Sequence, residues 1–324
     1  MRRPAPQTKR NFPMNLRVTA LTQNSNAIAN IRLRSADLAK FYDQVSSGVR
    51  IEKASDDPSK YPALTEAKAA SNRLKSYAGT VSESTAVLNS GVSTLQDVND
   101  ILVRAKNIAL EANDASTQPE SREALASEVD SLISRALITV NSRPDGSSLF
   151  SGTALDTNAF RVATTDAQGR PATVVYDGAD QRARVVTGRG TTVDTRYVGS
   201  EVFQQPGADV FASLIALRDD LRGTSGSSAT FNQALDQRIT DLTAARDSIS
   251  ATIGEQAGNL ATLSTLSNVI SDSKLDFDSR VGDLEGTDYA EAVVKMQEAS
   301  TALQAIYAVT AQLADPGLLD FIGR

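Results

Sequence analysis

A row of apolar residues that repeats every seven positions is the feature that most constrains the fold of this 324-residue chain. Such a row is typical of a helix seam and not of a β-strand. Its members are Ala67, Leu74, Val81, Leu88, Leu95, Leu102 and Ala109. The predicted helix runs from about Pro62 to Asn113, and roughly 50 residues at 1.5 Å each would make it about 75 Å long. A compact globule does not need so long a helix, so the sequence predicts a rod.

Helical seams also mark both ends of the chain. In the N-terminal segment, one heptad position holds Leu21, Ile28, Ser35, Tyr42 and Val49. A second position holds Asn24, Ile31, Leu38 and Val45. A C-terminal helix predicted over Asp288 to Leu313 has the stripe Ala292, Met296, Ala299, Leu303, Ile306 and Leu313. Isolated helices of about 30 residues are marginal without packing. We therefore expect the terminal helices to pair side by side and to contribute residues to subunit interfaces.

The middle of the chain changes character between Arg143 and about Val202. Glycine, threonine and valine increase, and the segments "TVVYDG", "RARVVTG" and "TTVDTRYVG" read as short strands separated by glycine-marked turns. Helices are predicted on both sides: one after "STQPES", one over "ADVFASLIALRDDLR" and one from Phe231 to Ile270. The predicted fold class is mainly α with a β insert, a long-helix coiled-coil rod with a small central β domain.

This order predicts a division of the chain into nested parts. Residues 1–13 are expected to form a disordered extension, with Met14 as the functional start. Residues 14–47 and 288–324 would form an inner coiled-coil domain, residues 48–142 and 223–287 a helical rod domain, and residues 143–222 a β-rich outer domain. The rod would then be flanked by two helical arms that fold back beside each other.

The composition excludes several classes of function. The chain has no cysteine and no histidine, which removes disulfides, thiolate nucleophiles, histidine-based triads and most zinc sites. A Ser–Lys or paired-carboxylate enzyme stays open, but we expect no catalytic, metal or cofactor site. A net charge of −6 argues against nucleic acid as a partner. No run of 18 apolar residues occurs, so membrane insertion is not expected.

The stretch "VSSGVRIEKASDDPSKYPA", from Val45 to Ala63, joins the first helix to the long one. Gly48 can end the first helix with a positive φ. Asp57 and Pro58 resemble a helix start, although Pro62 predicts that the long helix begins only after a short turn. A well-capped joint between two helices explains all of this. Its charged residues, Arg50, Asp56 and Asp57, are also candidate polar contacts with neighbouring subunits.

The same stretch resembles a signature of the flagellin superfamily, "SSG-x-R-I" followed by "D-D-P". Further segments are similar to the hook–filament junction family within it: "SLFSGTALDTNAF", "YDGADQRARVVTGRGTTVDTRYVGSEVF" and "LEGTDYAEAVVKMQEASTALQAIYAVTAQLADPGLLDFI". Together they extend over residues 14–321. The chain departs from the pattern at Pro62 and in the extension before Met14.

The resemblance implies a non-enzymatic structural role outside the cell, at the hook–filament junction of the bacterial flagellum. The implied partners are hook-associated protein 1, flagellin, neighbouring copies of the chain, and a cytosolic export chaperone that binds the C-terminal region. Export would use the flagellar type III apparatus. A filament flagellin is the nearest alternative. A helical chemoreceptor-type rod is another, which the central strands disfavour.

Overall fold

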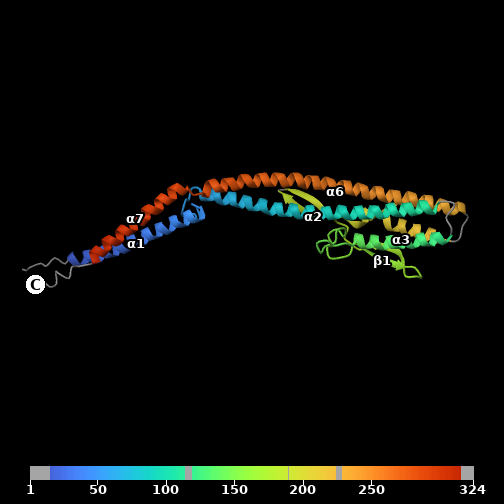
Figure 1. The fold of residues 1–324 in the computed structure, drawn as a ribbon, viewed down its shortest axis with the longest axis horizontal. Helices are drawn as coiled ribbons and strands as arrows, with labels where there is room; N and C mark the ends of the chain where they lie inside the picture. Colours follow the sequence, from blue (N-terminus) through green and yellow to red (C-terminus); the bar gives the residue numbers. More distant parts are fainter. Residues whose placement is uncertain (1–14, 114–118, 189, 224–227, 315–324) are drawn as a thin grey trace, which may run out of the picture. The chain divides into compact units, whose positions relative to one another are not determined.

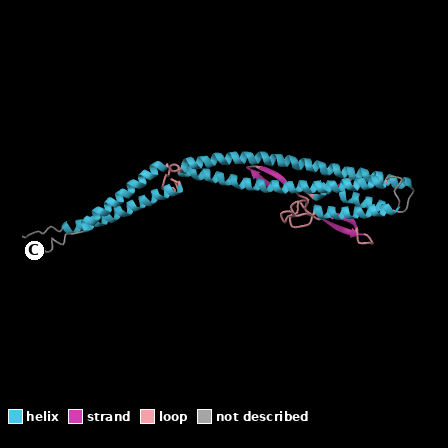
Figure 2. Ribbon diagram, viewed as in Figure 1, coloured by secondary structure: helices cyan, strands magenta, loops and turns pink. Residues whose placement is uncertain are grey.

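The computed structural model describes residues 15–113, 119–188, 190–223 and 228–314. Long helices dominate it (Figures 1 and 2). They are α1 (Asn15–Ser47), α2 (Tyr61–Ala112), α3 (Pro119–Val140), α5 (Val210–Arg222), α6 (Ser228–Glu285) and α7 (Tyr289–Ala314), with a short α4 (Gly199–Phe203). The chain forms two compact units, one made of the residues up to Ala70 with those from Asp276 onward, and one made of Ser71–Leu275.

The larger unit is built on α2 and α6, which lie side by side along their length (Figure 1). The heptad row predicted on α2 is confirmed, because Leu88, Leu95, Leu102 and Ala109 are all buried. From α6, the buried apolar residues are Leu235, Leu242, Ala245, Ile249, Leu263 and Ile270. Polar contacts fix the two helices at the edges of this core, such as Lys106 Nζ donating to Thr243 Oγ1 (3.1 Å).

Helices α3 and α5 pack against each other in the same unit. A buried guanidinium holds them together, because the Arg218 side chain is 1% exposed. It donates to the Pro171 carbonyl (2.6 Å) and to the carboxylates of Asp219 (2.8 Å) and Asp130 (3.4 Å). Arg222 pairs with the other oxygen of Asp130 (2.8 Å). Buried arginine is stable only with such partners, so this network defines how α3, α5 and β2 meet.

The predicted strands occur as antiparallel pairs. Strand β1 (Phe160–Thr165) pairs with β2 (Pro171–Tyr176), β3 (Ala183–Gly188) with β4 (Thr191–Arg196), and the short β5 (Gln204–Gln205) with β6 (Ala208–Asp209). The ring of Phe160 lies within 6 Å, centroid to centroid, of three others, those of Tyr176, Phe203 and Phe211. The Phe150 ring in turn contacts that of Phe203 (5.0 Å). These aromatic contacts seat the β1–β2 hairpin on the helices.

One helix limit differs clearly from the prediction, and another agrees with it. The helix expected to end near Ile270 continues to Glu285, although its last residues are largely exposed. The helix after the first joint begins at Tyr61, in agreement with the short turn predicted before Pro62. Residues 1–13, predicted to be a disordered extension, lie outside the described residues.

Candidate functional site: the terminal helix pair and its joint

The smaller unit contains the joint where α1 passes into α2 and α6 passes into α7. Gly48 ends α1 with a φ of +73°, as predicted, and its N–H donates to the Gln44 carbonyl (2.9 Å). Its carbonyl accepts from the Thr287 N–H (3.0 Å), and the Arg50 N–H donates to the Glu285 carbonyl (2.6 Å). A short antiparallel bridge between Val49 and Gly286 therefore ties the two connections together.

The backbone conformation favours glycine at position 48. A positive φ near +73° is unfavourable for residues with a side chain. A Cβ built at this position would also lie 2.6 Å from the Tyr289 hydroxyl oxygen. This hydroxyl is the end of a flexible side chain that is 57% exposed and free to move aside, so the positive φ is the main requirement for glycine, as the predicted helix stop indicated.

The charged residues of the joint make contacts within the chain. Asp57 Oδ1 accepts from the N–H groups of Ser59 (3.2 Å) and Lys60 (3.1 Å) and from the Ser59 hydroxyl (2.6 Å). These bonds hold its pKa below the usual range, the Ser59 hydroxyl first among them. Arg50 pairs with Asp57 (3.5 Å) and donates to the Leu284 carbonyl (3.3 Å). Asp57 thus caps the turn that leads into α2.

Asp56 closes the neighbouring turn. Its Oδ2 accepts from the N–H groups of Glu52 (3.2 Å) and Lys53 (3.1 Å), and its Oδ1 pairs with Lys40 of α1 (3.1 Å). Partial burial would raise the pKa of this carboxyl, but the bonds from Lys40 and from the two backbone N–H groups outweigh it, so the pKa is lowered. An ion pair between Lys68 and Glu285 joins α2 to the end of α6. Neither Lys68 nor Glu285 was singled out from the sequence.

Helices α1 and α7 lie antiparallel and side by side, as the sequence predicted (Figure 1). The half-buried row of α1 consists of Ala27, Ile31, Ser35, Leu38, Phe41 and Val45. Ile28 and Tyr42, placed on the seam by the heptad, are 45% and 64% exposed. The contact row is therefore rotated, passing through Ala27 and Phe41 instead. The side chain of Leu21 lies outside the described residues.

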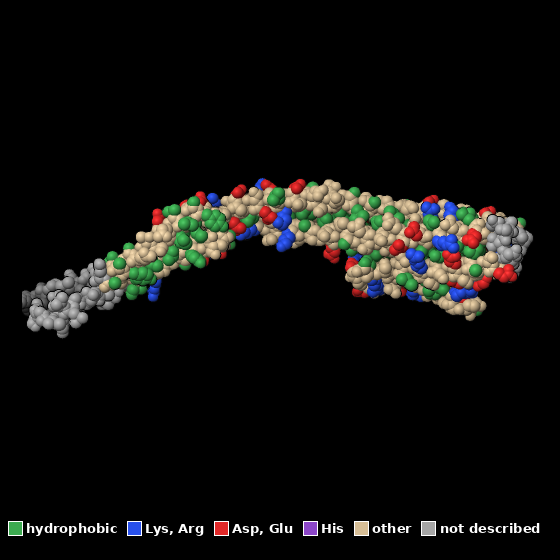
Figure 3. All heavy atoms as spheres, in the orientation of Figure 1, with side chains coloured by type: hydrophobic (Ala, Val, Ile, Leu, Met, Phe, Trp, Pro, Cys, Tyr) green, Lys and Arg blue, Asp and Glu red, His purple; other side chains and the backbone are tan. Residues whose placement is uncertain are grey.

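On α7, the row that faces α1 agrees with the predicted stripe. Ala292 and Ala299 are buried, and Met296, Leu303 and Ile306 are half-buried. The Leu313 side chain lies outside the described residues. The other faces of the helix carry apolar residues among the polar ones, because Val293, Val294, Tyr307 and Val309 are all about half exposed. Hydrophobic side chains accordingly gather on the surface of the α1–α7 pair (Figure 3).

Apolar residues on two sides are typical of a helix that packs against neighbours on both sides. A shallow groove on α7 is lined by Val294, Gln297, Glu298, Thr301, Ala302 and Ala305. Helix α1 covers only the opposite face. The terminal pair of this unit therefore presents a surface suited to other helices, and this surface, with the joint, is the candidate functional site.

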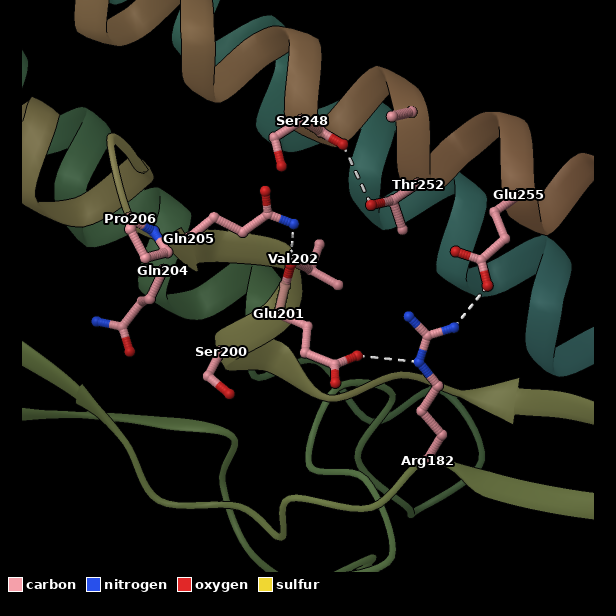
Figure 4. A pocket seen from close by; sticks show the side chains of 11 residues that line it. Arg182, Ser200, Glu201, Val202, Gln204, Gln205, Pro206, Ser248, Thr252 and Glu255 are labelled. Carbon is pink, nitrogen blue, oxygen red and sulfur yellow. Dashed lines mark hydrogen bonds and ion pairs between the residues drawn. The ribbon is translucent and has the colours of Figure 1, made fainter.

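A second concave region lies in the larger unit, between α6 and the segment 200–206 (Figure 4). Arg182 is central to it, bonded to Glu201 (3.0 Å) and Glu255 (2.5 Å) and lying over the Tyr197 ring at 4.7 Å. Burial would lower the pKa of Arg182, but its two carboxylate partners outweigh this and raise it. Burial raises the pKa of Tyr197 to about 12, and its hydroxyl accepts from Asn259 (3.0 Å).

These contacts anchor the strand region to α6 and leave the carboxylates of the cleft engaged with arginine. Among the described residues, no group of histidine, cysteine, aspartate and glutamate side chains is arranged to hold a metal ion. Within the same residues, no helix is long and apolar enough to cross a membrane. The sequence did not indicate the role of Arg182, because a lone arginine before a strand carries no recognisable pattern.

Comparison with known proteins identifies the class to which this architecture is similar. Residues 18–154 match the bacterial flagellin N-terminal helical region. A solved structure from Vibrio parahaemolyticus, described as a flagellar hook-associated protein, aligns with a TM-score of 0.63 at 22% identity, over 71% of this chain and 100% of that one. At this identity the likeness establishes the fold, which is flagellin-like.

The particular relatives are more specific. Flagellar hook-associated protein 3 of Salmonella typhimurium is 23% identical over 297 residues, which span 88% of this chain and 92% of the relative. A flagellin of Clostridium tyrobutyricum is 24% identical over 108 residues, or 33% of this chain and 29% of the relative. The resemblance to the hook–filament junction family of the flagellin superfamily, predicted from the sequence, is confirmed by these matches.

Proposed function

We propose that this chain is a structural adaptor of the bacterial flagellum that forms the junction layer between hook-associated protein 1 and the flagellin filament. The observation that carries the proposal is the near end-to-end match to hook-associated protein 3. The exposed apolar faces of α7 support it, because they require partners beyond α1. The protein would be located outside the cell, after export by the flagellar type III apparatus.

The proposed division of labour follows the arrangement of helices. Residues 14–47 and 288–324 would form the inner domain, and residues 48–142 with 223–287 the rod domain. Residues 143–222 would form the outer domain. The inner helices would bury their remaining apolar surface only against neighbouring copies of the chain, hook-associated protein 1 and flagellin. Ordering of the termini would then be coupled to assembly.

The joint has a defined task in this scheme. Its backbone bridge and the contacts of Arg50, Asp56 and Asp57 hold the ends of four helices together. We propose that these three residues shape the passage from inner to rod domain, and that their remaining surface contacts neighbouring subunits. Before assembly, the apolar C-terminal helix would need protection, which a cytosolic export chaperone would supply.

Filament flagellin is the alternative, and two observations favour the junction role over it. The flagellin relative matches only a third of this chain. The segment Ser148–Phe160, which resembles the junction family, also has a structural role: Ser148 and Phe150 are buried, and the Phe150 carbonyl accepts from the Gly199 N–H (2.8 Å). The relatives are components of flagella, which supports a non-enzymatic role.

Deleting the gene tests the proposal. An adaptor that starts the first layer of the filament should leave finished hooks without filaments when it is lost, and flagellin should be secreted into the medium. Electron microscopy of the cells and immunoblotting of the culture supernatant would measure both. Reintroducing the wild-type gene is the control and should restore filaments. A deletion strain that still grows full-length filaments would contradict the junction role.

A further inference from the structure

Two stripes border the contact row of the α1–α7 pair, with exposed apolar residues at their ends and a half-buried serine in the middle of each. On α1 the stripe is Ile28, Ser35 and Tyr42, and on α7 it is Val293, Ser300 and Tyr307. Members of each stripe are seven residues apart, so each stripe keeps to one face of its helix. The apolar members, at the ends of the stripes, are 45–64% exposed, whereas the two serines between them are half-buried.

Both stripes fall on the same side of the pair. Tyr42 follows Leu38 of the contact row by four residues, and Tyr307 follows Leu303 of the opposite row by four. When two helices run antiparallel, moving the same number of residues along each chain from the contact row turns both side chains toward the same side of the pair. The stripes therefore border the seam between the two helices on one side of the pair. We call this seam the side groove; it has apolar residues at both ends and serines in the middle.

The joint fixes which residues of α1 and α7 lie opposite each other along the helix axes, which we call their level, because the Thr287 N–H donates to the Gly48 carbonyl. Counting six residues back from Gly48 and six forward from Thr287 brings Tyr42 level with Val293. Counting twenty each way brings Ile28 level with Tyr307. The two apolar ends of the side groove are thus 14 residues apart, or about 21 Å at the helical rise.

The far face of α7 has a matching spacing. Val294 and Val309 are exposed there and are 15 residues apart, or about 22 Å. The small residues Thr301, Ala302 and Ala305 lie between them along the shallow groove described above. This far stripe therefore repeats the pattern of the side groove, apolar at both ends and small in the middle, on a different surface of the same unit.

Charges on the two surfaces are complementary. Arg32 follows Ile28 by four residues and is exposed beside the side groove, and Glu298 follows Val294 by four and is exposed on the far stripe. Neither has an ion-pair partner in the described part of the chain. When two copies of the chain lie parallel with their joints level, Arg32 of one copy and Glu298 of the other are five residues apart along the helix axis. This separation is about 7.5 Å, which the two side chains can span together.

From this match we propose that the side groove of one copy receives the far stripe of α7 from a second copy, with the two α7 helices parallel and Glu298 beside Arg32. Because the two surfaces differ, the contact is heterologous and repeats from copy to copy instead of closing into a two-fold dimer. The inference rests on the proposed function for its biological setting, and it names the surfaces by which copies of the chain meet.

Cysteine crosslinking tests the contact, since the chain contains no cysteine. The variant Tyr42→Cys with Val294→Cys places one thiol on each surface at nearly the same level. After mild oxidation of isolated flagella, we expect a ladder of dimers, trimers and larger species from this full-length variant. Each single variant should give no crosslinked species. The nearly isosteric pair Ser35→Cys with Thr301→Cys provides a second test at mid-groove that perturbs packing less.

A matched control keeps the cysteine in the side groove and moves the second cysteine to the other end of the far stripe. Tyr42→Cys with Val309→Cys joins the same groove to the opposite end of the far stripe, about 22 Å away, and should give no ladder. The proposal would be overturned if only this control gave a ladder, or if neither the Val294 pair nor the Val309 pair gave one. Dimers from a single-cysteine variant, with nothing larger from the pairs, would overturn it in favour of a two-fold contact.

Charge exchange gives an independent readout. Arg32→Glu in the Tyr42→Cys, Val294→Cys background should lower the crosslinked fraction about tenfold, because it places like charges together. Adding Glu298→Arg should restore it. No change with Arg32→Glu would remove the charge pairing from the proposal. Filament growth is measured separately, by expressing each variant in the deletion strain. Variants that support filaments but do not crosslink would contradict this contact without contradicting the junction role.

Discussion

Replacing Arg218 with alanine should lower the free energy of unfolding of the larger unit by about 3 kcal/mol. The guanidinium is 1% exposed, and its removal would leave the Pro171 carbonyl without its donor and Asp130 with a single arginine partner. It would also open a void between α3 and α5. Chemical denaturation followed by circular dichroism measures the change.

The control for this prediction is an ion pair of good geometry at the surface. Arg104 binds Glu128 through two bonds (2.6 and 2.7 Å), but its side chain is 46% exposed. Arg104→Ala should cost less than about 1 kcal/mol, because exposed pairs contribute little. Equal losses for the two variants would show that burial does not set the contribution of Arg218.

Leu303→Asp should prevent incorporation of the chain into flagella while the larger unit keeps its stability. Leu303 is half-buried in the contact between α1 and α7 and belongs to the smaller unit. A carboxylate there would oppose the pairing of the terminal helices, at a cost of about 2 kcal/mol or more. We expect at least a tenfold loss of protein in isolated flagella, measured by immunoblotting beside denaturation of the purified variant.

Gln304→Asp is the matched control, since it introduces the same charge at the next residue, which is exposed. This variant should be incorporated normally. If Leu303→Asp instead lowered the denaturation midpoint of the whole chain, the terminal helix would be part of the core of the isolated protein, and coupling of its order to assembly would be contradicted.

Periodic features of this fold could be predicted from the sequence because local repetition specifies them. The α2 seam is buried except at Leu74, which is half-buried, and Gly48 has the positive φ expected of a helix stop. The end of α6 could not be predicted, because its apolar period stops near Ile270. The helix continues to Glu285 with exposed residues, supported by local contacts such as the Arg280–Asp276 pair (3.2 Å).

Other features depend on contacts between distant segments. The contact row of α1 passes through Ala27 and Phe41 and exposes Ile28 and Tyr42. The position of α7 decides which face of α1 is covered, and the heptad of α1 alone does not specify it. Arg218 reads as a surface charge in sequence, and only the packing of α3 on α5 buries it. The far stripe of α7 does not stand out in the sequence, because Val294 and Val309 do not belong to the apolar row that predicts its contact with α1.

The position of this chain in the flagellum tests its role as a junction adaptor most directly. A labelled antibody against the chain, viewed by electron microscopy on wild-type cells, should mark a single band at the distal end of the hook. An adaptor joins two assemblies at one place and needs few copies, whereas a filament subunit occupies the full length. Label distributed along the whole filament would contradict the account and support the flagellin alternative.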